Sequence, residues 1–330
     1  MSRVTDMRLT TLGLIFVFAL AVLAAPLAGQ AQQARRPYRI GVLHRGYFLN
    51  IPQVEGLRAG LKAMGLEEGR DVTFDIRFTR GNLEAGQAAA EALAKAGLDL
   101  IFTVGEHETL AAKAATQTIP VVFTGVGDPV AAGIVTAVAH PGGNLTGVSN
   151  LTTELVPKRL EILKAIVPTL RRVWAVYHAD DRTGLAAARK AQEVAPLLKL
   201  QVVEQPVRTT EELVRTLKAV RPGDGLLSPG VVMNIPGVIL DLQVGARVPA
   251  VFYSTFWVEA GGLASYGAVT YAEGFQAARL VAKILRGARP QDLPVEGANK
   301  IELAINLKTA KALGVTIPRE ILARADQVIE

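Results

Sequence analysis

RIGVLHRGYFLNIPQVEGLRAGLKAM, residues 39–64, contains the unit from which the fold is predicted. Residues 39–44 form a short apolar run typical of a buried strand, and residues 54–64 have the apolar spacing of a helix that ends at Gly65. The same order of apolar run and amphipathic stretch recurs in two similar series, which meet near residue 150. Such alternation predicts the α/β class, with parallel sheets covered by helices on both faces.

The composition narrows the class of protein. The chain has 330 residues, of which 50% are hydrophobic and 20% charged, so it is not disordered as a whole and is long enough for two domains. It contains no cysteine, which excludes a disulfide scaffold, a cysteine zinc site and a thiol nucleophile. The net charge of +6 is spread along the chain without a basic run, so nucleic acid is not an expected partner.

The N-terminal segment has the pattern of a signal peptide. Basic residues precede an uncharged apolar run at 12–25, which is shorter than the roughly 20 residues that span a bilayer. Gly29 and Ala31 stand at the −3 and −1 positions of a cleavage site. We therefore expect a signal peptide at 1–31 and a periplasmic mature protein, with an uncleaved membrane anchor as the alternative.

Two open α/β halves predict a clamp. Ligands of such sheets bind beyond the carboxyl ends of the strands. If the two halves face each other, their ligand-facing loops form one cleft that closes on a small molecule by hinge motion.

Six segments between residues 56 and 318 carry a resemblance to a known family. They are GLRAGLKAMGLEEGR (56–70), IPVVFTGVGDP (119–129), PGGNLTGVSN (141–150), KRLEILK (158–164), FWVEAGGLASYG (256–267) and KIELAINLKTAKALGVTIP (300–318). By these segments the chain resembles the exported substrate-binding proteins of ABC transporters, specifically the tryptophan-binding-protein-like group, whose best-studied members bind aromatic amino acids.

The resemblance implies a type I periplasmic-binding-protein fold, with two Rossmann-like lobes and three interlobe crossings. The crossings are expected near Asn150, near 265–268 and near 294–300. The N-terminal lobe would comprise 38–150 with 268–294, and the C-terminal lobe 151–267 with 295–330. The implied partners are a small-molecule ligand and an ABC permease in the inner membrane.

One loop departs from the family's pattern. After the third strand the family usually has a small-residue turn, whereas this chain has Gly105, Glu106, His107, Glu108 and Thr109. In the family this loop lies at the cleft, where helix N–H groups receive an anionic ligand end. Two carboxylates there would oppose a ligand carboxylate, which leaves open a ligand with a cationic or hydroxyl-rich end.

Candidate ligand-binding residues end or follow the expected strands, or lie at an expected crossing. They are Arg45, Tyr47, Phe48, Gly105, Glu106, His107, Thr124, Gly125, Asp128, Asn150, His178, Ser228, Tyr253 and Tyr266.

Several of these candidates also have a purely structural interpretation. Tyr47 and Phe48 could pack under their own loop, and acidic residues at 106 and 108 suit the start of a solvated helix. Asp128 before Pro129 suits the N-cap of a helix expected at 128–139.

The sequence does not predict catalysis. It contains no Gly-x-Ser-x-Gly, no Walker A motif and no Gly-x-Gly-x-x-Gly at the glycines near Thr124. No catalytic residue, no metal site and no cofactor is expected. The predicted function is that of an exported solute receptor of an ABC importer, most simply a monomer, that binds an amino acid or related polar molecule. The alternatives are a ligand-sensing input domain and, less favoured, an α/β enzyme.

Overall fold

The computed structural model describes residues 36–46, 48–80, 82–228 and 236–330. The expected signal peptide at 1–31 and Tyr47 lie outside the described residues. Tyr38–Glu330 forms one compact unit, to which all of the following applies.

The first sheet is fully parallel and has six strands in the order β11-β5-β4-β3-β1-β2. Its strands are β1 (Tyr38–His44), β2 (Val72–Phe78), β3 (Leu100–Val104), β4 (Val121–Val126), β5 (Leu145–Ser149) and β11 (Glu296–Gly297). Successive residues of a strand point to opposite faces, so the continuous apolar runs supply two cores at once. Ile40 and Val42 pack into the core on one face of the sheet, and Leu43 packs into the core on the opposite face.

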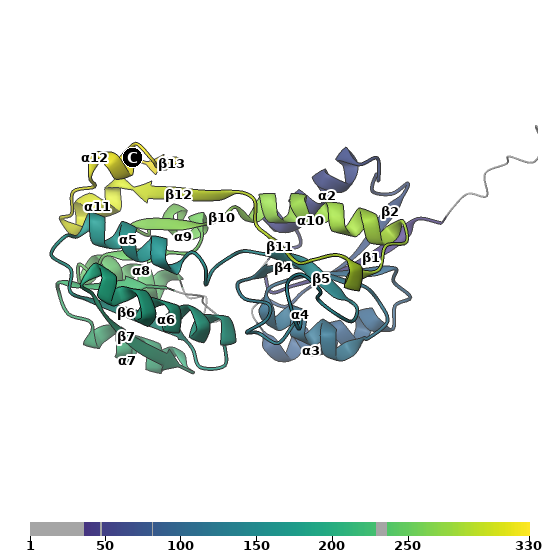
Figure 1. The fold of residues 1–330 in the computed structure, drawn as a ribbon, viewed down its shortest axis with the longest axis horizontal. Helices are drawn as coiled ribbons and strands as arrows, with labels where there is room; N and C mark the ends of the chain where they lie inside the picture. The colour runs from purple at the N-terminus through teal and green to yellow at the C-terminus, as the bar shows by residue number, and fades with distance from the viewer. Residues whose placement is uncertain (1–35, 47, 81, 229–235) are drawn as a thin grey trace, which may run out of the picture. The chain divides into compact units, whose positions relative to one another are not determined.

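Helices cover both faces of this sheet (Figure 1). They are α2 (Pro52–Ala63) and α10 (Thr270–Leu285) on one face and α3 (Leu83–Ala94) and α4 (Glu106–Ala115) on the other. The helix α10 comes from late in the chain and packs beside α2.

The second sheet has seven strands in the order β13-β12-β10-β9-β8-β6-β7. Its strands are β6 (Arg172–His178), β7 (Gln201–Val207), β8 (Asp224–Leu227), β9 (Ala250–Phe252), β10 (Ala264–Ala268), β12 (Ile301–Asn306) and β13 (Gln327–Ile329). All neighbours are parallel except β10 and β12, which pair antiparallel. The expectation of a parallel sheet therefore fails at this one junction, because the chain returns from the first sheet directly into β12.

Two groups of helices cover the second sheet. The helices α5 (Val156–Ile166), α6 (Arg182–Val194), α11 (Leu307–Leu313) and α12 (Arg319–Leu322) share one core. The helices α7 (Thr210–Ala219), α8 (Pro236–Gly245) and α9 (Thr255–Glu259) share the other.

The chain passes between the sheets three times, as expected. The passages run from β5 to α5, from β10 to α10 and from β11 to β12. Because β11 pairs with β5, the third passage begins after Gly297, and the lobe boundary expected at residue 295 lies slightly too early.

The prediction of a helix at 128–139 is wrong. This segment forms turns, in which the amide N–H of Ala132 bonds the Asp128 oxygen and that of Ile134 bonds the Pro129 oxygen. Gly133 then adopts φ of +71°, a left-handed conformation that ends the turn before a helix can propagate.

Candidate ligand-binding site

Two predicted ligand-binding residues, Arg45 and His107, meet Glu108 at the carboxyl ends of β1 and β3. The Nη2 group of Arg45 donates to Nδ1 of His107 at 3.0 Å, and Nε of Arg45 lies 3.4 Å from Oε1 of Glu108. Burial first, and then the nearby charge of Arg45, lowers the pKa of His107 to about 4. His107 is therefore a neutral imidazole at neutral pH, held as an acceptor by Arg45.

Two glycine turns position the start of α4. Gly105 is the N-cap of α4 with φ of +110°, and its amide N–H donates to the Thr124 oxygen at 2.9 Å. Gly125 has φ of +68°, and its amide N–H donates to Oε2 of Glu273 at 3.0 Å. Burial raises the pKa of Glu273, in α10, to about 8. Glu273 thus connects α10 to the last residues of β4.

Glu106 joins the first lobe to the second. It is the first residue of α4, and its carboxylate accepts a hydrogen bond from the hydroxyl of Thr183 in the first turn of α6. Asp181 is the N-cap of α6 and accepts the N–H of Gly184 at 2.8 Å. Burial raises the pKa of Glu106, and the neighbouring charge of Asp181 raises it further.

The loop after β4 also contacts this turn of α6. A Cβ added at Gly127 would lie 2.4 Å from Cγ2 of Thr183 and 2.8 Å from Cβ of Thr152. Only glycine fits at 127, and the two lobes are in van der Waals contact there.

In the second lobe, an unpaired buried cation lies among predicted residues. Arg159 in α5 is 0% exposed. Its Nε donates to the Tyr266 oxygen at 2.7 Å and its Nη1 to the Thr152 oxygen at 2.9 Å, while Nη2 has no hydrogen-bond partner within the part of the chain that the structure describes. Burial lowers the pKa of Arg159 to about 9, so the group stays charged at neutral pH. Tyr253 and Glu154 are near enough to act on that pKa, and burial raises the pKa of the Tyr253 phenol.

Several buried polar atoms near strand ends have no hydrogen-bond partner among the described residues. Among them are Oγ1 of Thr124 near the end of β4, Oγ of Ser228 after β8, and Oε2 of Glu108 near the start of α4. Nearly all buried polar atoms in proteins are hydrogen-bonded, so such exceptions require an explanation. Their position at the carboxyl ends of strands makes them available to a molecule bound there.

Residues 50–329 match the family model described as ABC transporter substrate binding protein. The chain belongs to this family. The resemblance on which the fold was predicted is confirmed.

Individual relatives agree with this substrate-binding-protein assignment. The tyrosine-binding protein of Clostridioides difficile is 26% identical over 263 residues, which cover 78% of this chain and 75% of the relative. The ABC domain from Streptococcus pneumoniae in complex with L-Trp superposes with a TM-score of 0.80 at 26% identity, covering 89% of this chain and 100% of that one. A conserved domain protein from Vibrio cholerae has the same TM-score and coverages at 30% identity.

Other predicted residues of this substrate-binding protein have local roles. Oδ1 of Asp128 accepts the N–H groups of Val130 and Ala131, so it caps a turn rather than a helix. Oδ1 of Asn150 accepts from the N–H and the hydroxyl of Thr152 in the first crossing.

Two further predicted residues lie at the edge of the site. Nδ1 of His178 accepts the N–H of Asp180, whose carboxylate pairs with Arg208 at 2.8 Å. Phe48 is 76% exposed and contributes little packing, so the interpretation that it packs under its own loop is wrong.

Three side chains that shape the site were not among the predicted residues: Arg159, Thr183 and Glu273. Arg159 lies inside the quoted segment KRLEILK, between the buried Val156 and Leu160. A charged residue on the buried stripe of a helix was the available signal. Thr183 and Glu273 carry no such signal, because both stand in first helical turns, where polar residues are ordinary.

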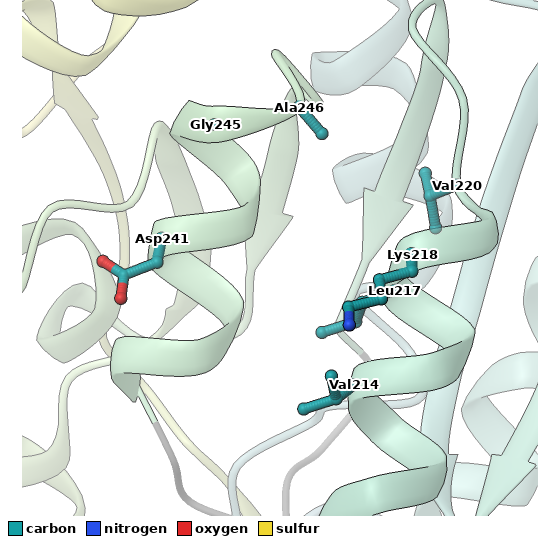
Figure 2. Close-up of a pocket in the computed structure, with 7 residues that line it drawn as sticks. All are labelled: Val214, Leu217, Lys218, Val220, Asp241, Gly245 and Ala246. Carbon is teal, nitrogen blue, oxygen red and sulfur yellow. The ribbon is translucent and has the colours of Figure 1, made fainter.

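A groove of about 500 Å³ lies elsewhere in the second lobe (Figure 2). It is lined by Val214, Leu217, Lys218, Val220, Asp241, Gly245 and Ala246. These residues belong to α7 and α8 and the segments after them, which lead into the amino ends of β8 and β9. The groove thus lies near the amino ends of the strands, whereas the candidate site lies at their carboxyl ends. None of the predicted ligand-binding residues lines the groove.

Neither a metal-binding cluster nor a membrane-spanning helix occurs among the described residues. No three His, Cys, Asp or Glu side chains among them gather into a group that could hold a metal ion. No helix within the described ranges combines the length and the apolar character needed to cross a bilayer.

Proposed function

We propose that this substrate-binding protein is a periplasmic receptor for one small polar molecule, an amino acid or a related compound, which it delivers to an ABC permease of the inner membrane. The observation that carries the proposal is the meeting of the strand ends of both sheets. Glu106 after β3 bonds Thr183 after β6, and Gly127 after β4 touches the same residue. The relatives that bind tyrosine and tryptophan support the ligand class.

The cleft offers a ligand both charge and hydrogen bonds. The first lobe would contribute Arg45, His107 and Thr124, and the second would contribute Ser228, Tyr253 and Tyr266. Only a closed state contacts the ligand from both lobes, so ligand binding favours closure. The three crossings would act as the hinge.

A binding role also fits the chemistry of the site. In the described part of the chain, Nδ1 of His107 accepts from Arg45 and Nδ1 of His178 accepts from the main chain of Asp180. Neither imidazole activates a serine or threonine hydroxyl, which is the arrangement that nucleophilic catalysis requires.

A thermal-shift screen of the protein tests the proposal. The panel contains the amino acids, their amines, sugars and small carboxylates. A true ligand at a hundredfold excess over Kd should stabilise the fold by about 2.7 kcal/mol. The compounds that raise Tm are then titrated by calorimetry and tested for uptake in cells with and without the gene. A panel that leaves Tm unchanged throughout would contradict the proposal.

A further inference from the structure

The carboxylate of Glu106 lies at the start of a helix from the other lobe. The carboxylate accepts a hydrogen bond from the hydroxyl of Thr183. Burial raises its pKa, and the N–H groups of Thr183 and Arg182 partly offset this rise. Glu106 itself begins α4, 77 residues earlier in the chain.

The start of α6 would otherwise attract an anion. The first N–H groups of a helix have no partner within the helix, and the helix dipole adds a partial positive charge. Here Asp181 takes the N–H of Gly184, and Glu106 faces the first two residues of the helix. The carboxylates of Asp181 and Glu106 therefore occupy the N–H groups at the start of α6 that an external anion would otherwise bind.

The surrounding charges reinforce this effect. Glu108 is 2% exposed and has one oxygen without a partner, and Asp181 is 7% exposed. The charge of Arg45 acts on both Glu108 and Asp181, and this guanidinium is already engaged by Glu108 and His107. An ammonium or a hydroxyl group is favoured beside such carboxylates, and a second anion is repelled.

We propose that Glu106 is a specificity-determining residue of the cleft: its carboxylate occupies the anion-binding end of α6, so the ligand presents an ammonium or hydroxyl group there and not a carboxylate. This inference rests on the proposed function and narrows its ligand class from amino acids in general to amines and related compounds that lack a carboxylate at this end.

Pairs of probes that differ only by a carboxylate provide the test. They are tyrosine with tyramine, phenylalanine with 2-phenylethylamine, and lysine with cadaverine. Calorimetry gives the ratio of Kd for the acid to Kd for the amine, in the wild-type protein and in Glu106→Gln. The glutamine keeps the size and the acceptor oxygen that Thr183 uses, but removes the charge.

For at least one pair, we expect the wild-type protein to bind the amine more tightly, and the ratio to fall by about tenfold or more in Glu106→Gln. Two matched variants separate charge from structure. Thr183→Val removes the hydrogen bond but keeps the carboxylate, so it should leave the preference for the amine. Glu211→Gln removes an exposed carboxylate from the first turn of α7 and should leave the ratio unchanged.

The two failures are distinguishable. Tighter binding of the acids, with a ratio that Glu106→Gln does not alter, would overturn this inference and leave the proposed receptor function intact. Absence of binding of all six probes to both proteins, together with a negative thermal-shift screen, would overturn both. Circular dichroism of each variant verifies that it is folded before either result is read.

Discussion

Arg159 and Tyr266 are joined by a hydrogen bond of 2.7 Å from the guanidinium Nε to the main-chain oxygen, although 107 positions separate them in the sequence. Tyr266 lies in β10, just before the second crossing, and the other bond of Arg159 goes to Thr152 in the first crossing. One buried side chain therefore holds two of the three crossings together. This contact fixes the two crossings relative to each other.

Substitution Arg159→Met tests that role. An apolar residue removes a buried charge, which by itself can stabilise a protein. It also leaves the oxygens of Thr152 and Tyr266 without their charged donor, at about 1–3 kcal/mol each. We expect the second effect to dominate, so the free energy of unfolding in urea should fall by about 2–4 kcal/mol.

Arg159→Lys is the control, since it keeps the charge but supplies a single donor group. Its stability should lie between those of the wild type and Arg159→Met. Equal stability of the wild type and Arg159→Met would show that the two carbonyl bonds are not needed.

Ser228→Ala tests the assignment of an unpartnered hydroxyl to ligand binding. Oγ of Ser228 is buried and bonds no atom of the described residues, so its removal should leave Tm without ligand unchanged or slightly higher. Affinity for a ligand found in the thermal-shift screen should fall about 5- to 30-fold, the loss of one or two kcal/mol.

The matched control is Ser265→Ala, whose hydroxyl is also buried and unpartnered but lies within β10 rather than beyond a strand end. If both variants lower affinity equally, or neither does, the assignment of Ser228 is wrong.

Glu273 makes stability depend on pH. Its pKa is about 8 in the folded protein, raised by burial, against 4.5 for an ordinary glutamate. The folded state therefore keeps a proton that the unfolded state releases, and stability falls as pH rises through the window from about 4.5 to about 8. The slope from this group alone is at most about 1.4 kcal/mol per pH unit.

Glu273→Gln cannot titrate and keeps an acceptor for the N–H of Gly125. Urea unfolding at pH 5, 6.5 and 8 should show a flatter dependence for the variant and, at pH 8, a more stable protein than the wild type. Parallel pH profiles for the two proteins would contradict the assignment. Glu106 and Glu108 also have pKa values raised by burial, so the difference between the two profiles is the informative quantity.

The packing of α2 against α10 depends on glycine. A Cβ at Gly56 would lie 2.0 Å from the Tyr271 oxygen, and one at Gly274 would lie 1.9 Å from the Gln53 oxygen. Because main-chain atoms cannot move aside alone, Gly56→Ala should force the helices apart and lower the free energy of unfolding by about 1–3 kcal/mol or more.

Gly86→Ala provides the opposite expectation within the same lobe. Gly86 lies in α3, and a Cβ there would meet nothing within 4 Å. Alanine should stabilise α3 by about 0.5–1 kcal/mol. Equal effects of the two substitutions in chemical denaturation would refute the role assigned to close helix contact.

The sequence alone determined the α/β alternation, the two series and the resemblance to the family, and the resemblance in turn implied the three crossings. These features depend on local periodicity and on the order of segments, and both can be read in one dimension. The helix at 128–139 failed because a single left-handed glycine outweighs an otherwise favourable start.

Only the tertiary structure decided which side chains meet. Glu273 bonds Gly125 across 148 positions and Thr183 bonds Glu106 across 77. Each pair consists of residues that are ordinary in their own helix or turn. These pairs form because the chain crosses three times between two sheets. The sequence pattern of apolar and polar positions predicts the face on which a residue lies, but it does not predict which distant residue lies next to it.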